Sequence, residues 1–213
     1  MSQLTQQSAT GGAPDSPLVA GLDLLTERER HADELILTFV AALHARGGSG
    51  ITAATHWARI GELRHITLSV ESASLKSDVF WEALWDTASA ASQDTTGVIL
   101  GEGYVGPPAW RHLVENAVAA HTGRSGGRAV IFPGSATLTG LVSVAELLDT
   151  SAIDRVRVLA GGEVNPATVI NTRGFLRPRW SDGELILDTQ PASGGTLVPF
   201  ETPSPTPCCA AHV

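Results

Sequence analysis

Lysine is almost absent from this chain of 213 residues, since only one of its 14 Lys and Arg residues, Lys76, is a lysine. The formal net charge is −8, and charged residues make up 17% of the sequence. Because no basic excess is available to neutralise phosphates, we expect no binding to nucleic acid or to an anionic membrane surface. The arginine bias, with abundant alanine and glycine, is typical of a GC-rich bacterial genome.

Long apolar runs are also lacking: no stretch approaches the roughly 18 uninterrupted apolar residues of a membrane-spanning helix. Residues 1–7 have neither the basic nor the apolar region of a secretory signal, so we expect a cytoplasmic protein. The body of the chain contains no nucleophile elbow, no Walker loop and no paired metal-ligand motif. A hydrophobic fraction of 43% is enough for a substantial core.

After a first helical pattern that begins at Thr26, short apolar runs alternate with helical patterns from about residue 65 to residue 159. Apolar residues at helical spacing predict helices over 26–46, 78–91, 137–148 and after Pro107-Pro108, and Thr26 with Glu29 resembles a capping box. Strand-like runs lie at 66–70, 97–100, 129–132 and 156–159. This alternation predicts an α/β fold with a parallel sheet core and flanking helices.

The pattern changes after Gly161-Gly162 to that of a small antiparallel β meander. Runs at 175–180 and 184–188 flank Ser181-Asp182-Gly183, and Asp-Gly is a strong hairpin signal. We therefore divide the chain into four parts. These are a disordered leader (1–20), the α/β core (21–162), the β extension of the same domain (163–202) and a flexible proline-rich tail (203–213).

The chain has only two cysteines, and Cys208 and Cys209 are adjacent in this tail, followed by His212. Thiolates are soft ligands that suit Cu(I) and Zn(II), and an imidazole suits several of the same ions. Three ligands are one short of a closed zinc site, so the Cys-Cys-x-x-His sequence predicts an open or shared soft-metal site. The alternative is that both cysteines are incidental or pack as small hydrophobes.

A disulfide between adjacent cysteines is strained. Their Cα atoms are about 3.8 Å apart across a trans peptide, whereas unstrained disulfides need about 4.4–6.8 Å. Such a bridge suits thiol–disulfide exchange more than a structural role. The Cys-Cys-Ala run at 208–210 resembles the C-terminal dithiol of mercuric reductases over three residues. The resemblance implies that a tail of this kind can transfer a thiophilic metal.

Two glycine-containing loops follow predicted strands. Gly101-Glu102-Gly103-Tyr104-Val105-Gly106 matches G-x-G-x-x-G, the pattern of a dinucleotide-binding turn. However, Pro107 and Pro108 follow at once, where the fingerprint helix should already be running. A ligand site here would use Gly101, Glu102, Gly103 and Tyr104, with Glu102 and Tyr104 as acid–base groups.

The second loop, 133–140, precedes a predicted helix, whose start could hold an anion with Gly134, Ser135 and Thr137. The alternative is ordinary capping by Ser135 or Thr137. In a parallel sheet both loops open at the same edge, so we expect them to share a pocket.

Three functional hypotheses follow. The leading one is a tail that binds or transfers a soft metal, or exchanges thiols. The second is a non-catalytic interaction module, with a protein partner or a second copy, whose surface is formed by tryptophan-bearing helices and the arginine cluster of Arg173, Arg177 and Arg179. The third is an enzyme that binds a small molecule or an anion at the two glycine loops.

Overall fold

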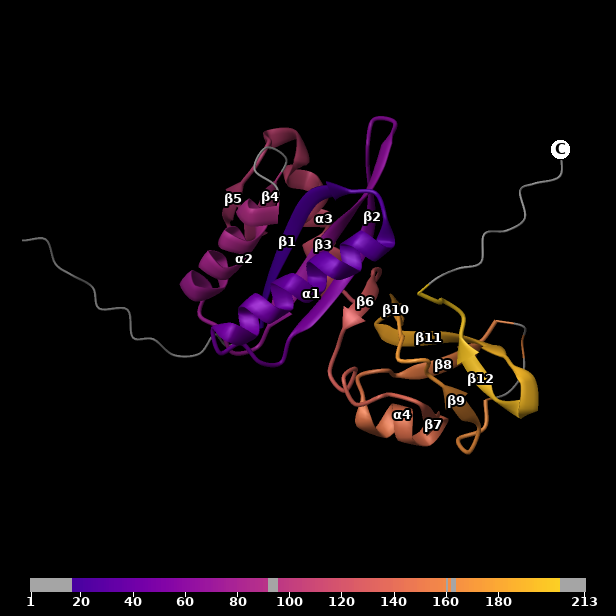
Figure 1. Ribbon diagram of the computed structural model, residues 1–213. Helices are drawn as coiled ribbons and strands as arrows, with labels where there is room; N and C mark the ends of the chain where they lie inside the picture. The colour runs from indigo at the N-terminus through magenta and orange to yellow at the C-terminus, as the bar shows by residue number, and fades with distance from the viewer. Residues whose placement is uncertain (1–16, 92–95, 160, 162–163, 204–213) are drawn as a thin grey trace, which may run out of the picture.

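The computed structural model describes residues 17–91, 96–159, 161 and 164–203 (Figure 1). Its N-terminal part contains three helices and six strands. The helices are α1 (Glu29–Ala45), α2 (Ser77–Ala91) and α3 (Arg111–Thr122), the last preceded by a 3-10 turn, η1 (Pro108–Trp110). The strands are β1 (Leu18–Thr26), β2 (Thr52–Ile60), β3 (Leu63–Ser72), β4 (Gly97–Leu100), β5 (Gly103–Val105) and β6 (Arg128–Ile131).

Strands outnumber helices in the C-terminal part of the described chain. It contains β7 (Leu141–Ser143), α4 (Val144–Thr150), β8 (Arg155–Val158), β9 (Val169–Asn171), β10 (Arg179–Ser181), β11 (Glu184–Pro191), the 3-10 turn η2 (Ser193–Gly195) and β12 (Leu197–Pro199). No helix within the described residues has the length and hydropathy needed to cross a bilayer.

The sheet is mostly antiparallel, and the predicted parallel core is therefore wrong. Its strand order is β5-β4-β1-β3-β2-β6-β10-β11-β12-β9-β7, with β8 beside β11. Among the strand pairs of the described residues, only β8–β11 and β9–β12 are parallel. The physical reason is the connections: Gly61-Glu62 joins β2 to β3, and Gly101-Glu102 joins β4 to β5. A two-residue loop can join only antiparallel strands, because a parallel crossover needs a dozen or more residues.

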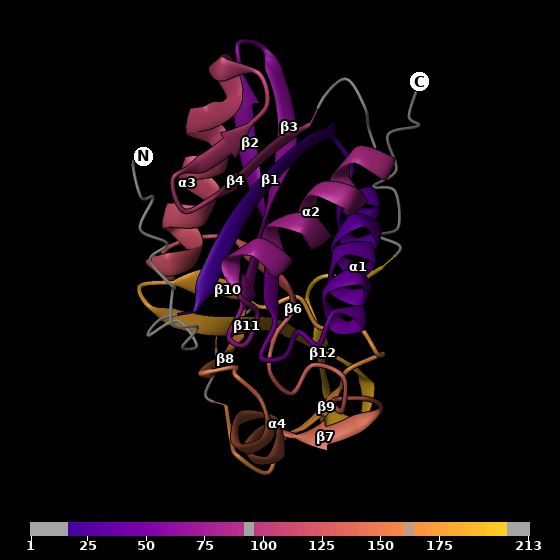
Figure 2. The same ribbon diagram turned by 90° about the vertical axis from the view of Figure 1, so that its left-hand side faces the viewer.

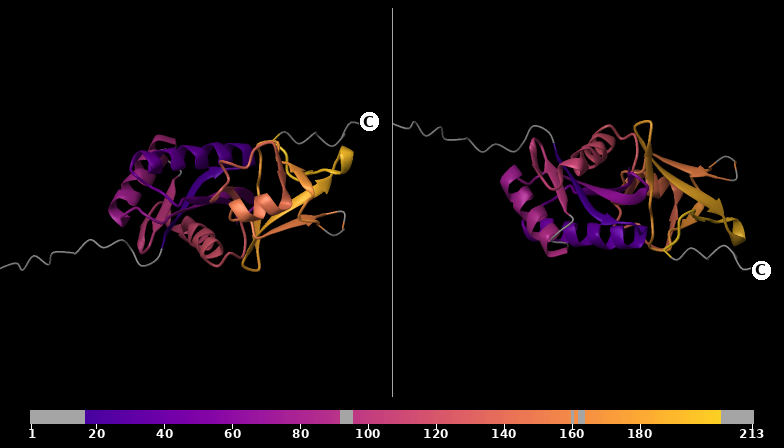
Figure 3. Two further views of the ribbon diagram at one scale, coloured as in Figure 1. Left: turned by 90° about the horizontal axis from the view of Figure 1, so that it is seen from below. Right: turned by 90° about the horizontal axis from the view of Figure 1, so that it is seen from above.

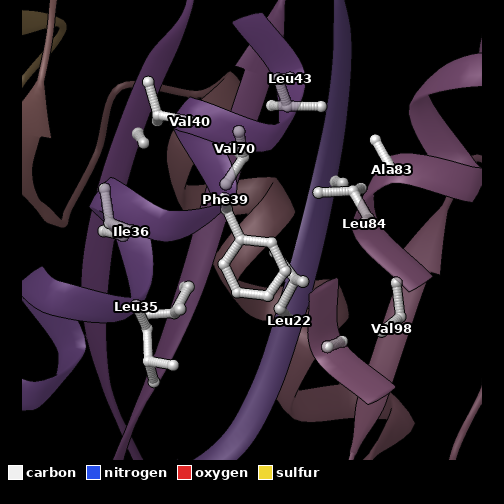
Figure 4. Close-up of a cluster of buried hydrophobic side chains, with 14 of the residues drawn as sticks. Leu22, Leu35, Ile36, Phe39, Val40, Leu43, Val70, Ala83, Leu84 and Val98 are labelled. Carbon is white, nitrogen blue, oxygen red and sulfur yellow. The ribbon is translucent and has the colours of Figure 1, made fainter. Parts of the chain in front are cut away.

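Helices cover both faces of the N-terminal sheet, which explains why its strands are apolar enough to resemble parallel ones. Figure 2 shows α1 and α2 on one side of the strands and α3 on the other. The main core lies under α1 and α2, where the fully buried Leu22, Phe39 and Leu84 meet (Figure 4). The α3 side approaches more closely, since an ideal Cβ on Gly21 would lie 2.5 Å from the carbonyl oxygen of Val114.

The C-terminal strands join the N-terminal sheet where β10 pairs with β6 through Arg179 and Arg128. The two parts lie side by side (Figure 3). A second apolar cluster fills the C-terminal part and contains the buried Leu147, Ile170 and Leu187. The predicted antiparallel meander is confirmed for β10, β11 and β12. In its Asp182-Gly183 turn both residues have positive φ, 53° and 89°, as a type I′ hairpin requires.

Three of the four predicted helices are confirmed, whereas the predicted capping box and the helix over 137–148 are wrong. The helices at 26–46, 78–91 and after Pro107-Pro108 are confirmed as α1, α2 and α3, but the capping box is wrong. Arg28 is the N-cap of α1 without a side-chain cap, and Thr26 ends β1 with its hydroxyl 3.1 Å from Nδ1 of His31. Of the expected leader, residues 1–16 lie outside the described residues, and Leu18–Ala20 belong to β1. In place of a helix over 137–148 the chain forms turns, then β7 and the shorter α4.

Candidate functional site

A groove of about 1020 Å³ runs along the junction between α1 and the C-terminal strands. One wall is formed by α1, with the exposed Leu37, and Trp57 of β2 adjoins it. The other wall comes from the segments around β11 and β12, including Phe200 and Glu201. We call this hollow the seam groove. A large hollow between two structural units is a common place for a ligand site.

Exposed apolar side chains gather around the seam groove. Seven large hydrophobic side chains are exposed in the described residues, and four of them line this groove. These four are Leu37 (50% exposed), Trp57 (44%), Leu159 (46%) and Phe200 (56%). Single exposed apolar residues are normal on a protein surface, but a contiguous group marks an interaction site.

A network of buried and partly exposed charges forms the floor of the seam groove. Arg128 donates to both carboxylate oxygens of Asp33 at 2.6 and 3.1 Å, and its Nε donates to Glu201 at 2.6 Å. Arg177 donates from Nε to Asp33 Oδ2 at 2.9 Å, while its guanidinium lies 4.0 Å over the ring of Phe175. Charges this far from water persist only when they are paired and hydrogen-bonded, so the floor is a fixed polar platform.

The two buried arginines respond differently to the same surroundings. Burial lowers the pKa of Arg128, but hydrogen bonds to Asp33 and Glu201 outweigh burial and hold that pKa above its usual range. For Arg177, burial prevails over the attraction of Asp33, and the neighbouring charge of Arg128 lowers its pKa further. Both guanidinium groups remain charged, because the ordinary pKa of an arginine lies far above neutral pH.

The arginine cluster expected from the sequence is only partly a surface feature. Arg177 points inward to Asp33, and its side chain is 13% exposed. Arg179 is half exposed and has Oε2 of Glu201 at 3.9 Å. Arg173 is exposed at a turn with φ 55°. The surface that this cluster offers to a partner protein is thus reduced to Arg173 and Arg179, since the Asp33 carboxylate of the chain itself holds Arg177.

The first glycine loop is the turn of a β-hairpin. Gly101 (φ 58°) and Glu102 connect β4 to β5, and Gly103 begins β5. The hydroxyl of Tyr104 donates to the carbonyl oxygen of Pro107 at 2.6 Å, and the pKa of Tyr104 is raised, first by burial and then by the nearby Asp23 carboxylate. No helix start receives this loop, so it lacks the geometry of a dinucleotide-binding turn.

The second glycine loop, with Gly134, Ser135 and Thr137, bonds within itself. Ser135 Oγ accepts from the backbone of Phe132 at 3.4 Å, and Thr137 donates to the carbonyl of Gly134 at 3.0 Å. An ideal Cβ on Gly134 would lie 2.2 Å from the carbonyl oxygen of Thr150, so glycine allows the loop to pack against the end of α4.

The two loops do follow strands that run in the same direction, since both β4 and β6 are reached from β1 by an odd number of antiparallel steps. They are nevertheless far apart. Strands β1, β3 and β2 lie between β4 and β6, which places the loops about 19 Å apart at the usual strand spacing. The structure does not bring them together in one pocket.

Cys208, Cys209 and His212 lie outside the described residues. Within the part of the chain that the structure does describe, no group of three or more His, Cys, Asp or Glu side chains gathers closely enough to hold a metal ion.

The sequence alone does not identify the polar partners of His56, His65 and Asp33. His56 and His65 had no identified partners, yet Nε2 of His56 lies 2.7 Å from Ser69 Oγ, and Nε2 of His65 lies 2.8 Å from Asp23 Oδ2. Asp33 lies on α1 among apolar positions and is buried with them, which is a signal in the sequence that a charged partner must exist. Comparison of the chain with family models, curated proteins and solved structures finds no match, so the functional argument depends on this geometry.

Proposed function

We propose that this protein is an interaction module whose seam groove binds an extended, uncharged, proline-containing peptide segment. The observation that carries the proposal is the convergence of Leu37, Trp57, Leu159 and Phe200 on one groove with a fixed polar floor. Aromatic-lined grooves recognise proline-rich segments because these are already extended before binding. Trp57, Phe175 and Phe200 supply aromatic rings here.

The occupant that we propose is the tail of the chain itself, residues 204–213. Pro203, the last described residue, lines the groove, so the tail starts at its rim. The tail contains Ser, Pro, Thr, Cys, Ala, His and Val but no Asp, Glu, Lys or Arg. This suits a groove whose floor carries Asp33 and Glu201 already paired with Arg128 and Arg177. Ten residues in a polyproline II conformation extend about 31 Å.

Quenching by tryptophan tests this docking in the full chain. A bimane fluorophore is attached to Cys208 in the Cys209→Ser variant, which leaves one thiol because the chain has only two cysteines. If the tail occupies the groove, Trp57 quenches the fluorophore, and Trp57→Phe relieves the quenching. Leu37→Glu should also relieve it by placing a charge in the apolar wall. The control is Leu141→Glu, at an exposed leucine that does not line the groove.

The outcomes separate the tail from other occupants. Quenching that is relieved by Trp57→Phe and is independent of protein concentration supports docking within one chain. Quenching that disappears on dilution assigns the groove to the tail of a second copy. Fluorescence that is the same in Leu37→Glu and Leu141→Glu rejects the groove as the place where the tail binds.

We further propose that the docked tail binds a soft metal ion, Cu(I) or Zn(II), through Cys208, Cys209 and His212. Supporting this is the ligand chemistry of two thiolates and an imidazole within five residues. Titration with Cu(I) under reducing conditions tests it directly. The double variant Cys208→Ser, Cys209→Ser should lose the bound ion, whereas equal affinity in that variant and in the unaltered chain rejects the metal role without affecting the docking proposal.

A further inference from the structure

A second hollow lies on the opposite face of the sheet, and one histidine nitrogen in it receives no hydrogen bond from the described residues. It measures about 540 Å³ and lies between β2, α3 and the Gly126-Gly127 segment. Its lining includes His56 and Thr67 on the sheet side and Leu113, Ala117 and Ala120 on the α3 side. We call it the α3 pocket. Among the described residues that line it there is no Asp or Glu, although the chain as a whole is acidic.

Behind the α3 pocket, four side chains form a continuous chain of polar contacts. Ser69 Oγ lies 2.7 Å from Nε2 of His56 and 2.7 Å from Nδ1 of His121. Nε2 of His121 in turn lies 3.4 Å from Oε2 of Glu71. His121 is held in place from the other side by the ring of Trp180, whose centroid is 4.8 Å away.

Which atom donates in each contact of this His56–Ser69–His121–Glu71 series is determined by Glu71 at one end. The Glu71 carboxylate favours a proton on the facing Nε2 of His121, so Nδ1 of a neutral His121 accepts a hydrogen bond. A serine hydroxyl has a single proton, and Ser69 gives it to His121. Ser69 must then accept from Nε2–H of His56. This leaves Nδ1 of His56 as a free acceptor.

His56 is suited to this role by its surroundings. Its side chain is 9% exposed, and no hydrogen bond to Nδ1 is formed within the described residues. Burial, and secondarily the nearby His121, lower the pKa of His56 to about 4, so the ring is neutral near pH 7 and keeps its lone pair. The charged or titratable groups around it are His121 and Glu71 behind the ring, with Arg59, His112, Arg128 and Arg179 along the pocket.

The backbone of Gly127 packs closely against the Cε1–Nδ1 edge of the His56 ring. Its φ is 107°, and an ideal Cβ would lie 2.5 Å from Cε1 and 2.9 Å from Nδ1 of His56. No other residue fits at this position without displacing the imidazole. Glycine at 127 therefore allows the imidazole to keep its position beside the α3 pocket, whereas an ideal Cβ on Gly126 would meet nothing within 4 Å.

We propose that the α3 pocket binds a small hydroxylated ligand of the phenol class and accepts its proton through His56, Ser69 and His121. The hydroxyl donates to Nδ1 of His56, and the apolar body lies against Leu113, Ala117 and Ala120. In the proton step the ligand O–H bond breaks and an N–H bond forms at Nδ1. The Nε2 proton of His56 moves to Ser69, and the proton of Ser69 moves to Nδ1 of His121. The products are a phenolate and an imidazolium beside Glu71.

4-Nitrophenol is the probe for this site, because its phenol and phenolate forms absorb at different wavelengths. Calorimetry measures its affinity for the full chain, and absorption measures the ionised fraction of the bound probe. We expect bound 4-nitrophenol to be more ionised than the free probe at the same pH. His56→Gln retains an amide that mimics Nε2–H but removes the Nδ1 acceptor, so we expect at least tenfold weaker binding.

The ionised fraction of the bound probe tests the positioning residues Ser69 and Glu71. Ser69→Ala interrupts the relay without removing Nδ1, so the probe should still bind while its ionised fraction falls to that of the free probe. Glu71→Gln, at a partly exposed side chain, should lower the ionised fraction as well and serves if Ser69→Ala does not fold. A merely structural role of these residues would change affinity and ionisation together, or change neither.

Two matched variants locate the probe. Ala120→Trp fills the α3 pocket from the helix, whereas Ala119→Trp adds the same side chain at the neighbouring exposed position outside the pocket. Binding that is lost only in Ala120→Trp supports the site. Binding unaltered by both Ala120→Trp and His56→Gln overturns the site, and an ionised fraction unaffected by Ser69→Ala and Glu71→Gln overturns the relay.

Discussion

Oδ2 of Asp23 lies 2.8 Å from Nε2 of His65, and neither side chain has any exposure to solvent. The other oxygen of Asp23 accepts from the backbone N–H of Leu25 at 2.9 Å, at a β-bulge where Leu25 has a φ of 51°. Backbone strain of this kind persists only where the surroundings determine it strongly. The pair therefore lies at the point where the register of β1 against β3 shifts.

Asp23→Asn should be strongly destabilising, because it removes the negative charge of a fully buried pair. We expect a loss of about 3 kcal/mol in the free energy of unfolding, measured by urea titration with an unchanged m-value. Asp86→Asn is the control, since the Arg46–Asp86 ion pair is exposed and should contribute at most about 1 kcal/mol. Equal losses in the two variants would contradict a structural role for the buried pair.

Asp33 is the residue on which the floor of the seam groove depends. Asp33→Ala leaves the buried guanidinium groups of Arg128 and Arg177 without their shared carboxylate, and we expect a loss of about 3–5 kcal/mol. Arg177→Met should cost less, about 2 kcal/mol, because Asp33 keeps both bonds from Arg128. Chemical denaturation of the two variants checks this order, and a larger loss in Arg177→Met would refute it.

Local chemistry made part of this fold predictable. Asp182-Gly183 defines its hairpin because both residues tolerate positive φ, and the apolar spacing in 78–91 defines α2. Strand β2 was missed because its buried Ala53, Ala54 and Thr55 give no alternation of large apolar and polar residues. Because β2 is not predicted, the β2–β3 hairpin that makes the sheet antiparallel is not predicted either. The run at 66–70 within β3 is therefore assigned to a parallel sheet.

Local sequence patterns could not predict the contacts of the two candidate sites, because the residues that meet there are distant in the sequence. Arg128 is 95 residues from Asp33, and Arg177 is 144 residues from it. Ser69 and His121 are 52 residues apart and meet only because α3 packs on the same face of β3. A lone polar residue in an apolar pattern, as at Asp33, shows that a partner exists but does not identify it.

The stability of the fold should depend on pH through His56. Its pKa is about 4 in the folded chain, against about 6.5 when unfolded, so between these values the unfolded chain binds more protons. The contribution of neutral His56 is therefore fully present above about pH 6.5 and is lost as the pH falls towards 4. It amounts to about 3 kcal/mol, with a slope of at most about 1.4 kcal/mol per pH unit.

Urea titrations at several pH values between 4 and 7 measure this slope. His56→Gln cannot titrate, so its stability should fall less steeply with decreasing pH than that of the unaltered chain. The difference between the two curves isolates His56 from the nearby His112, His121 and Glu71, which both proteins retain. Parallel curves would show that His56 is already protonated, or equally solvated, in the folded chain.

Gly21 sets the distance between α3 and the sheet. An ideal Cβ at this position would lie 2.5 Å from the carbonyl oxygen of Val114 and 3.0 Å from Cγ2 of Val118, so Gly21→Ala forces the helix away from β1. We expect a loss of about 1–3 kcal/mol in the free energy of unfolding, as for an overpacked core. Gly126→Ala is the matched control, because its Cβ meets nothing within 4 Å. Displacement of α3 should also weaken 4-nitrophenol binding in Gly21→Ala, whereas equal stability of the two variants would show that α3 adjusts without cost.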